Sequence, residues 1–254
     1  MIYLDNAATT FKKPINVIEA INHALTSYGN SGRGAYRAAL DSGRMVYETR
    51  EKISKFFGSS DPSKVIFTSN ATEGLNIVLF GLFCSGDHVI STVTEHNSVL
   101  RPLYKLEKTK NIGIDFIGID ESGKLKYDEF EKYIRPNTKA IVVNHISNVT
   151  GEIADLEYIS KVAKSNNLYL IVDASQSAGN IDINMTKTGI DILCFTGHKS
   201  LLGPQGTGGM IIAPGVEIAP LSFGGTGVET YNPDMPLENP NHLEAGTLNG
   251  HGIA

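Results

Sequence analysis

A lysine lies where the sequence predicts the end of a buried strand. Lys199 follows the apolar run 190–195, belongs to the stretch 196–200 and precedes the glycine-rich turn 203–209. Desolvation at such a position lowers the pKa of an ammonium group, and it frees the amine for Schiff-base chemistry with carbonyl compounds. A lone lysine after a strand is more often simply solvated, so the interpretation depends on the groups that accompany it.

Three further kinds of polar side chain follow other predicted strands. Asp173 ends a run that is apolar on both faces, where a carboxylate is costly unless it meets a cation such as a protonated pyridine nitrogen. The same residue is equally suited to capping its own loop. His96 could stack on an aromatic ring, and Asn148 and Gln176 could bind a phenolic oxygen, although such side chains more often bind nearby backbone.

The sequence also predicts an anion site at the start of a helix. Asn70 and Glu73 have the spacing of a capping box, which places the helix start. The free N–H groups there would attract an anion and Thr72 would add a hydroxyl, although an ordinary cap alone explains the pattern. Taken together, the amine, the carboxylate, the histidine and the anion site match a phosphorylated pyridine aldehyde.

Alternating helices and strands position these groups. The predicted helices cover residues 14–25, 37–57, 70–82, 98–106, 127–134 and 155–166. The predicted strands cover residues 65–68, 88–91, 112–117, 140–144, 168–173 and 190–195. Continuously apolar strands between helices indicate a mostly parallel sheet covered on both faces. Ligands bind beyond the carboxyl ends of such strands, so we expect the polar groups to meet in one crevice.

Composition limits the possible function classes. The chain has 254 residues, of which 41% are hydrophobic and 19% are charged, and its formal net charge is -5. This composition is typical of a soluble globular protein, and it argues against a nucleic-acid or membrane partner. No signal peptide is recognisable, so we expect a cytoplasmic protein. Cys84 and Cys194 have neither metal-ligand nor disulfide spacing, and we expect no metal site.

The whole chain resembles the class V aminotransferases of pyridoxal-phosphate-dependent fold type I, especially the cysteine desulfurase and selenocysteine lyase branch. The resemblance rests on six motifs in the same order, at residues 3–9, 68–73, 95–97, 147–151, 172–176 and 196–199. It implies that residues 1–254 form the α/β large domain, with a mostly parallel mixed sheet and helices on both faces. Residues 1–15 would lie near the substrate site or the small domain. Residues 222–254 would form a dimer-interface loop and begin the connection to a small domain that we expect this chain to lack.

The resemblance assigns roles to individual residues. Lys199 would form the Schiff base with pyridoxal 5'-phosphate and serve as a base, and His96 would stack on the ring and complete the catalytic pair. Asp173 would pair with the ring nitrogen. The other residues expected to bind the cofactor are Ala71, Thr72, Asn148, Gln176, Thr196, His198 and, toward the neighbouring subunit, Thr247. The residues expected to meet the substrate are Ala7, Ala8, Asn148 and Arg33.

The reaction implied by the resemblance converts L-cysteine to L-alanine and leaves the sulfur as a cysteine persulfide. A homodimer with shared active sites and a sulfur-acceptor protein are implied as well. In this family a small C-terminal domain carries the persulfide cysteine and a substrate-carboxylate arginine, and neither Cys84 nor Cys194 matches that cysteine. Tyr36 and the pair 242–243 also depart from the common pattern.

Two alternative functions remain open at this point. One is another class V reaction, namely selenocysteine lysis, transamination or β-elimination. The other is a non-catalytic fragment or scaffold that binds pyridoxal phosphate without turnover.

Overall fold

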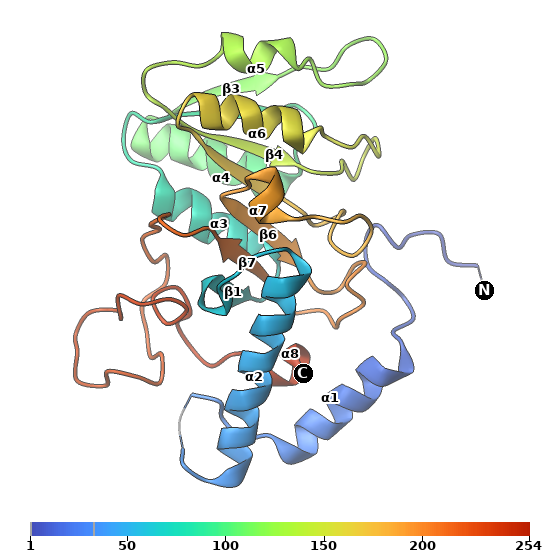
Figure 1. The fold of residues 1–254 in the computed structure, drawn as a ribbon, viewed down its shortest axis with the longest axis vertical. Helices are drawn as coiled ribbons and strands as arrows, with labels where there is room; N and C mark the ends of the chain where they lie inside the picture. The colour runs from blue at the N-terminus through green and yellow to red at the C-terminus, as the bar shows by residue number, and fades with distance from the viewer. Residues whose placement is uncertain (1, 33) are drawn as a thin grey trace.

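A mixed seven-stranded sheet forms the centre of the computed structural model, which describes residues 2–32 and 34–254 (Figure 1). The strands are β1 Val65–Thr68, β2 His88–Thr92, β3 Gly113–Ile117, β4 Thr138–Asn144, β5 Tyr169–Asp173, β6 Ile192–Thr196 and β7 Gly208–Ile212. Their order is β1-β7-β6-β5-β4-β2-β3. β7 runs antiparallel to both of its neighbours, whereas the other paired strands are parallel. The predicted mostly parallel sheet is confirmed.

Helices cover both faces of the sheet (Figure 1). They are α1 Ile15–Ser27, α2 Arg37–Phe56, α3 Ala71–Leu82, α4 Asn97–Lys110, α5 Asp128–Lys132, α6 Leu156–Ser165, α7 Met185–Thr188 and α8 Gly250–Ile253, with a 3-10 turn at Pro62–Lys64. Within the described residues, no helix combines the length and the apolar character needed to cross a membrane.

The alternation of side chains along each strand divides the core into two layers. Ile141 and Val143 of β4 pack with α5, α6 and α7, while Val142 between them packs with α3 and α4. Successive strand residues point to opposite faces, so a strand covered on both sides must be apolar throughout. This explains why the runs in β4, β5 and β6 show no polar alternation.

Among the helix boundaries that differ from the prediction, two can be traced to tertiary contacts. α4 continues past residue 106 to Lys110, whose amine donates to the carbonyls of Phe80 at 2.9 Å and Phe83 at 2.6 Å. α5 is shorter than predicted, since Tyr127 lies just outside its N-terminus and accepts a hydrogen bond from the backbone N–H of Asp155 at 2.8 Å.

The predicted glycine-rich turn 203–209 ends inside a strand. Gly208 and Gly209 belong to β7, beside the start of α3. A Cβ atom at position 208 would lie 2.7 Å from the Cα of Asn70, so a side chain there would displace the start of α3. Gly208 thus allows β7 to lie directly against the segment that caps α3.

Candidate active site

A cavity of about 310 Å³ lies at the carboxyl ends of β4, β5 and β6. Its lining residues are Ala7, Ala8, Asn70, Ala71, Thr72, His96, Ser98, Asn144, Ile146, Asn148, Asp173, Ser175, Gln176, Thr196, His198 and Lys199. The predicted convergence of polar strand ends on one crevice is confirmed. The N-terminal segment reaches the same cavity from the other end of the chain.

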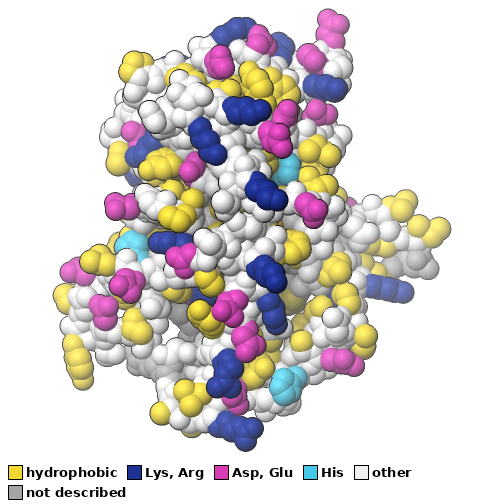
Figure 2. Space-filling model, in the orientation of Figure 1, with side chains coloured by type: hydrophobic (Ala, Val, Ile, Leu, Met, Phe, Trp, Pro, Cys, Tyr) yellow, Lys and Arg dark blue, Asp and Glu magenta, His cyan; other side chains and the backbone are white. Residues whose placement is uncertain are grey.

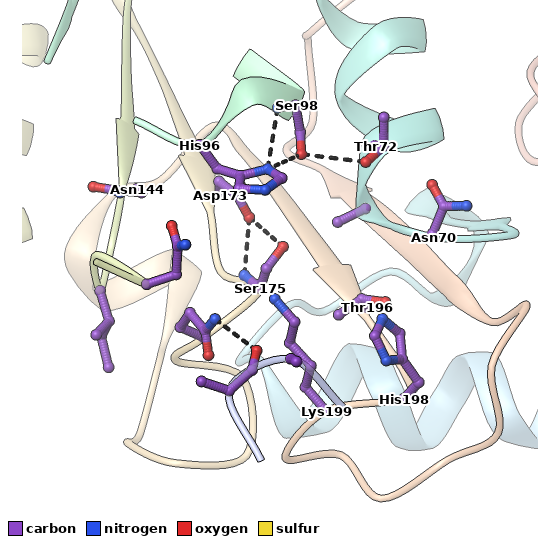
Figure 3. A pocket seen from close by; sticks show the side chains of 16 residues that line it. Asn70, Thr72, His96, Ser98, Asn144, Asp173, Ser175, Thr196, His198 and Lys199 are labelled. Atoms are coloured by element: carbon purple, nitrogen blue, oxygen red, sulfur yellow. Dashed lines mark hydrogen bonds between the residues drawn. The ribbon is translucent and has the colours of Figure 1, made fainter. Parts of the chain in front are cut away.

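Lys199 enters the cavity from a tight turn after β6. Gly197 begins that turn, and a Cβ atom there would lie 2.2 Å from the Thr207 hydroxyl, so a larger residue would disturb the turn. Figure 3 shows the Lys199 amine directed toward Asp173 and Ser175. Burial lowers the pKa of Lys199, and the Asp173 carboxylate acts in the opposite direction. The lowered pKa favours a neutral, nucleophilic amine.

Asp173 ends β5 as a buried carboxylate with one oriented oxygen. Its Oδ1 accepts hydrogen bonds from the backbone N–H of Ser175 at 2.9 Å and from the Ser175 hydroxyl at 2.5 Å. Within residues 2–32 and 34–254, its Oδ2 has no hydrogen-bond partner. The Ser175 contacts fix the orientation of the carboxylate, and Oδ2 is free to accept a hydrogen bond from a cationic ligand.

The ring of His96 is fixed by Ser98 (Figure 3). Its Nδ1 accepts a hydrogen bond from the backbone N–H of Ser98 at 3.1 Å and also contacts the Ser98 hydroxyl. The Thr72 hydroxyl in turn donates to the Ser98 hydroxyl at 3.2 Å. Because a backbone N–H can only donate, Nδ1 is an acceptor and a neutral His96 carries its proton on Nε2.

Glu95 lies beneath the cavity and contacts the backbone of Asn144, which lines it. It is buried, and its Oε1 accepts hydrogen bonds from the Thr92 hydroxyl at 2.7 Å and from the backbone N–H of Asn144 at 2.9 Å. Its Oε2 is buried without a partner among the described residues. Burial raises the pKa of Glu95 to about 8, opposed by these two hydrogen bonds and aided by Asp173.

The N-terminus of α3 faces the cavity opposite Asp173. Asn70 accepts a hydrogen bond from the backbone N–H of Glu73 at 2.9 Å, and Glu73 accepts one from the backbone N–H of Ser69 at 2.6 Å, so the predicted cap is confirmed. The N–H groups of Ala71 and Thr72 have no acceptor in the described parts of the chain. Together with Thr196 and His198 they form a donor-rich end of the cavity suited to an anion.

The amide side chains of Asn148 and Gln176 and the alanines Ala7 and Ala8 also line the cavity. Gln176 donates from Nε2 to the carbonyl of Ala7 at 3.0 Å and so connects the N-terminal segment to the loop after β5. Asn148 and Ala8 line the same cavity. Arg33 lies outside the described residues.

Thr247, Tyr36 and His242 do not line this cavity. Thr247 lines two other hollows of the same chain. Tyr36 is exposed at the start of α2. The ring nitrogens of His242 contact the backbone carbonyls of Pro236 at 2.7 Å and Ile218 at 3.1 Å. His242 therefore connects two loop segments.

Neither Cys84 nor Cys194 is among the residues that line the cavity. Cys84 is exposed and follows the C-terminal end of α3, whose N-terminus lines the cavity. A helix of 12 residues separates the two ends by about 18 Å. Cys194 is buried in β6 within the layer covered by α3 and α4.

Comparison with known proteins assigns the family. Residues 2–254 match the family described as Aminotransferase class-V. The chain belongs to the class V aminotransferase family. A probable cysteine desulfurase of Methanothermobacter thermautotrophicus is 36% identical over 99% of this chain and 64% of its own length. The predicted family is thereby confirmed, and this relative supports the predicted branch.

Solved structures of other proteins share the fold. The apo cysteine desulfurase of Thermococcus onnurineus superimposes with a TM-score of 0.91 at 34% identity, over 99% of this chain and 64% of that one. SspA in complex with cysteine gives a TM-score of 0.87 at 29% identity, over 100% of this chain and 70% of that one. The class V chain described here thus spans about two thirds of the length of such relatives.

Sequence reasoning missed several residues that shape the class V site. Ser98, Ser175 and Asn144 line the cavity without having been assigned a role there. Their contacts join different segments, as where Glu95 meets Asn144, 49 positions away. Only Ser175 carried a local signal, because a serine two positions after an aspartate is typical of a side-chain turn.

Proposed function

We propose that this chain is the cofactor-binding large domain of a pyridoxal-phosphate-dependent cysteine desulfurase, which converts L-cysteine to L-alanine. The observation that carries the proposal is the meeting of Lys199, Asp173 and the N-terminus of α3 in one cavity. The description of the Methanothermobacter relative and the cysteine bound to SspA support the choice of substrate.

The donor set in the cavity fits the cofactor. The Lys199 amine would hold the aldehyde carbon, the free oxygen of Asp173 would face the pyridine nitrogen, and His96 would cover the ring. The N–H groups of Ala71 and Thr72, with Thr196 and His198, would hold the phosphate. Asn148 and Gln176 would bind the ring oxygen or neighbouring groups. Pyridoxal phosphate, when bound, supplies an electron sink for bond breaking at the substrate α-carbon.

Lys199 would move the substrate proton, and His96 would donate a hydrogen bond beside it. The lowered pKa of Lys199 leaves its amine able to accept the proton from the α-carbon of the substrate. His96 presents Nε2–H on the side away from Ser98, where it can donate a hydrogen bond as well as stack. Ala7, Ala8, Asn148 and Arg33 are proposed to meet the substrate.

Sulfur acceptance would need a cysteine beyond residues 1–254. Cys194 is buried, and burial followed by the effect of Asp173 raises its thiol pKa well above the usual value. Cys84 lies past the far end of α3. A small domain would therefore supply the thiol that receives sulfur, and a separate acceptor protein would take the persulfide sulfur onward.

We also propose a homodimer in the cytoplasm, in which Thr247 reaches the neighbouring subunit's phosphate. Support comes from large apolar side chains exposed on two segments, a combination typical of interfaces. They include Leu4 at 91% exposure near the N-terminus and Tyr231 at 100% and Leu237 at 89% in the loop after β7. Acidic and basic side chains alternate over the face shown in Figure 2, without a large area of one sign.

Cofactor attachment is the first test of the proposed function. The purified chain mixed with pyridoxal phosphate is expected to gain a visible absorption band from the bond to Lys199. Lys199→Ala should lose that band, while Lys187→Ala, which removes an exposed lysine of α7, should keep it. Circular dichroism of each variant checks folding. A folded wild-type chain without the band would refute the assignment.

Product analysis then tests the reaction. The full-length protein carrying the small domain is expected to convert L-cysteine to alanine with an equal amount of persulfide. Pyruvate and ammonia would instead identify a β-eliminating lyase, and turnover restricted to selenocysteine would identify a selenocysteine lyase. A protein that binds the cofactor without any turnover would be a scaffold.

A further inference from the structure

Residues 9–13 of the N-terminal segment form hydrogen bonds with the backbone of His198 and Lys199, in the turn that follows β6. The carbonyl of His198 accepts hydrogen bonds from the backbone N–H of Thr10 at 3.1 Å and from the Lys13 amine at 2.9 Å. The carbonyl of Lys199 accepts one from the Thr10 hydroxyl at 2.6 Å. These contacts join positions about 189 residues apart in sequence, and they hold the two cavity residues by their main chain.

Thr9 lies at the centre of this contact and has two acceptors within reach. Its hydroxyl is 3.0 Å from Nδ1 of His198 and 3.2 Å from the carbonyl of the same residue. A hydroxyl has one proton, so it can donate fully to only one of them. The choice between the two acceptors decides which ring nitrogen of His198 carries the proton.

The carbonyl is already satisfied by other donors. A carbonyl oxygen has two lone pairs, and here Thr10 and Lys13 both approach more closely than Thr9 does. Among the described residues, the Thr9 hydroxyl is the donor that lies within hydrogen-bond distance of Nδ1, whereas the Thr10 N–H and the Lys13 amine contact the carbonyl. The hydroxyl proton of Thr9 is therefore directed to Nδ1, and the neutral ring keeps its own proton on Nε2.

We propose that Thr9 is a positioning residue for the anion-binding end of the cavity, where its hydroxyl donates to Nδ1 of His198 and so presents Nε2–H as a donor to a phosphate group. Figure 3 shows the His198 ring beside Thr196, on the side of the cavity that also holds Asn70 and Thr72. The role of the phosphate rests on the proposed function, whereas the state of the ring does not.

Burial and the charged groups around the ring favour its neutral form. Burial lowers the pKa of His198, and the nearby cations Lys199, on its own turn, and Lys13, from the N-terminal segment, lower it further. A neutral imidazole can give only one hydrogen bond, so a proton on Nδ1 would leave a lone pair facing the anion. Thr9 prevents that arrangement by occupying Nδ1 as a donor.

The test compares Thr9→Val, which removes the hydroxyl in nearly the same shape, with Thr9→Ser, which retains it. Nitrogen NMR of histidine-labelled protein without cofactor reports the tautomer, and His198→Gln assigns the signal. Wild type and Thr9→Ser should carry the proton on Nε2. In Thr9→Val the neutral ring loses its donor at Nδ1, so the pKa of His198 should rise.

The outcomes separate this proposal from the proposed function. A wild-type ring protonated on Nδ1, or a His198 pKa that falls or stays unchanged in Thr9→Val, would overturn the role of Thr9 even if the cofactor binds. Conversely, the predicted ring state in a chain that never binds pyridoxal phosphate would overturn only the proposed function. If the role of Thr9 and the proposed function are both correct, Thr9→Val should bind pyridoxal phosphate about fivefold more weakly than wild type. Thr9→Ser should bind it with the wild-type affinity.

Discussion

Arg50 of α2 and Glu244 of the C-terminal segment form a buried ion pair with two contacts. Nη1 of Arg50 lies 2.7 Å from Oε1 of Glu244, and Nη2 lies 2.5 Å from Oε2. The same Oε1 accepts a hydrogen bond from the backbone N–H of Phe67 at 2.6 Å, and the guanidinium lies 4.5 Å from the Phe67 ring centre. The pair thus holds Glu244, at the start of the C-terminal segment, against β1 and α2.

Glu244→Gln should destabilise the fold strongly. The exposed fractions of the Arg50 and Glu244 side chains are only 7% and 5%, so the substitution leaves a guanidinium without its counter-charge. Removing one partner of such a buried pair costs about 3–5 kcal/mol in the free energy of unfolding. Urea unfolding followed by circular dichroism measures the change.

An exposed ion pair provides the matched control for Glu244→Gln. Asp128→Asn removes the partner of Lys132 on α5, where both side chains are largely in water. Exposed pairs contribute little to stability, so the urea midpoint should stay unchanged. Equal effects of the two substitutions would contradict a stabilising role for the buried pair.

Glu244 illustrates what the sequence could not reveal. Local patterns predicted the start of α3 from Asn70 and Glu73 and the cavity lysine from the strand before it, because those signals lie within a few residues. The partner of Glu244 is 194 positions away, and no local pattern indicates it. The segment 244–249 was therefore assigned only a role toward another subunit, by resemblance.

In the cavity, too, some features follow from local sequence patterns and others depend on contacts between distant segments. The order of the strands brings Asp173, Lys199 and the start of α3 together, and the rule that ligands bind at the carboxyl ends of parallel strands predicts this. Ser98 and Thr9 act through their contacts with His96 and His198. Such contacts depend on how segments pack, which hydrophobic periodicity does not specify.

Gly81→Ala should lower stability although alanine favours helices. A Cβ atom at position 81 of α3 would lie 2.2 Å from the carbonyl oxygen of Ala219 and 2.6 Å from Cγ2 of Ile218. The gain in helix propensity is about 1 kcal/mol, while forcing an extra atom against the backbone of the facing segment costs about 1–3 kcal/mol or more. We expect a net loss in the free energy of unfolding, measured by urea denaturation.

Gly43→Ala is the corresponding control in α2. A Cβ atom there would meet only the Ser31 carbonyl oxygen, at an ordinary contact distance of 3.5 Å. Only the propensity gain remains, so the free energy of unfolding should rise by about 0.5–1 kcal/mol. Stabilisation by both substitutions would show that the segment at Ala219 yields without cost.

The two cysteines should differ in reactivity toward a thiol reagent. Cys84 is exposed, whereas Cys194 is buried and has a raised thiol pKa. The thiolate is the reactive form, so Cys84 should react at once and Cys194 only after unfolding. Thiol titration in buffer and in denaturant measures this, and Cys84→Ser should abolish the rapid phase. Rapid reaction of Cys194 in the folded protein would contradict its burial.

Glu95 should make stability decrease as pH rises. Its pKa is raised from 4.5 to about 8 by burial, so between these values the unfolded chain has released a proton that the folded chain still holds. Folding then requires proton uptake, and the free energy of unfolding falls by up to about 1.4 kcal/mol per pH unit. Above the folded-state pKa the carboxyl ionises in both states and the contribution levels off.

Glu95→Gln isolates this contribution from other titrating groups. Glutamine keeps a carbonyl oxygen for the Thr92 hydroxyl and the N–H of Asn144 but cannot ionise. The stability of the variant relative to wild type should therefore increase with pH from about 5 to about 8 and be constant outside that range. Urea midpoints across this series measure the difference. A constant difference would mean that Glu95 is already ionised when the chain is folded, and that its charge is stabilised within the protein.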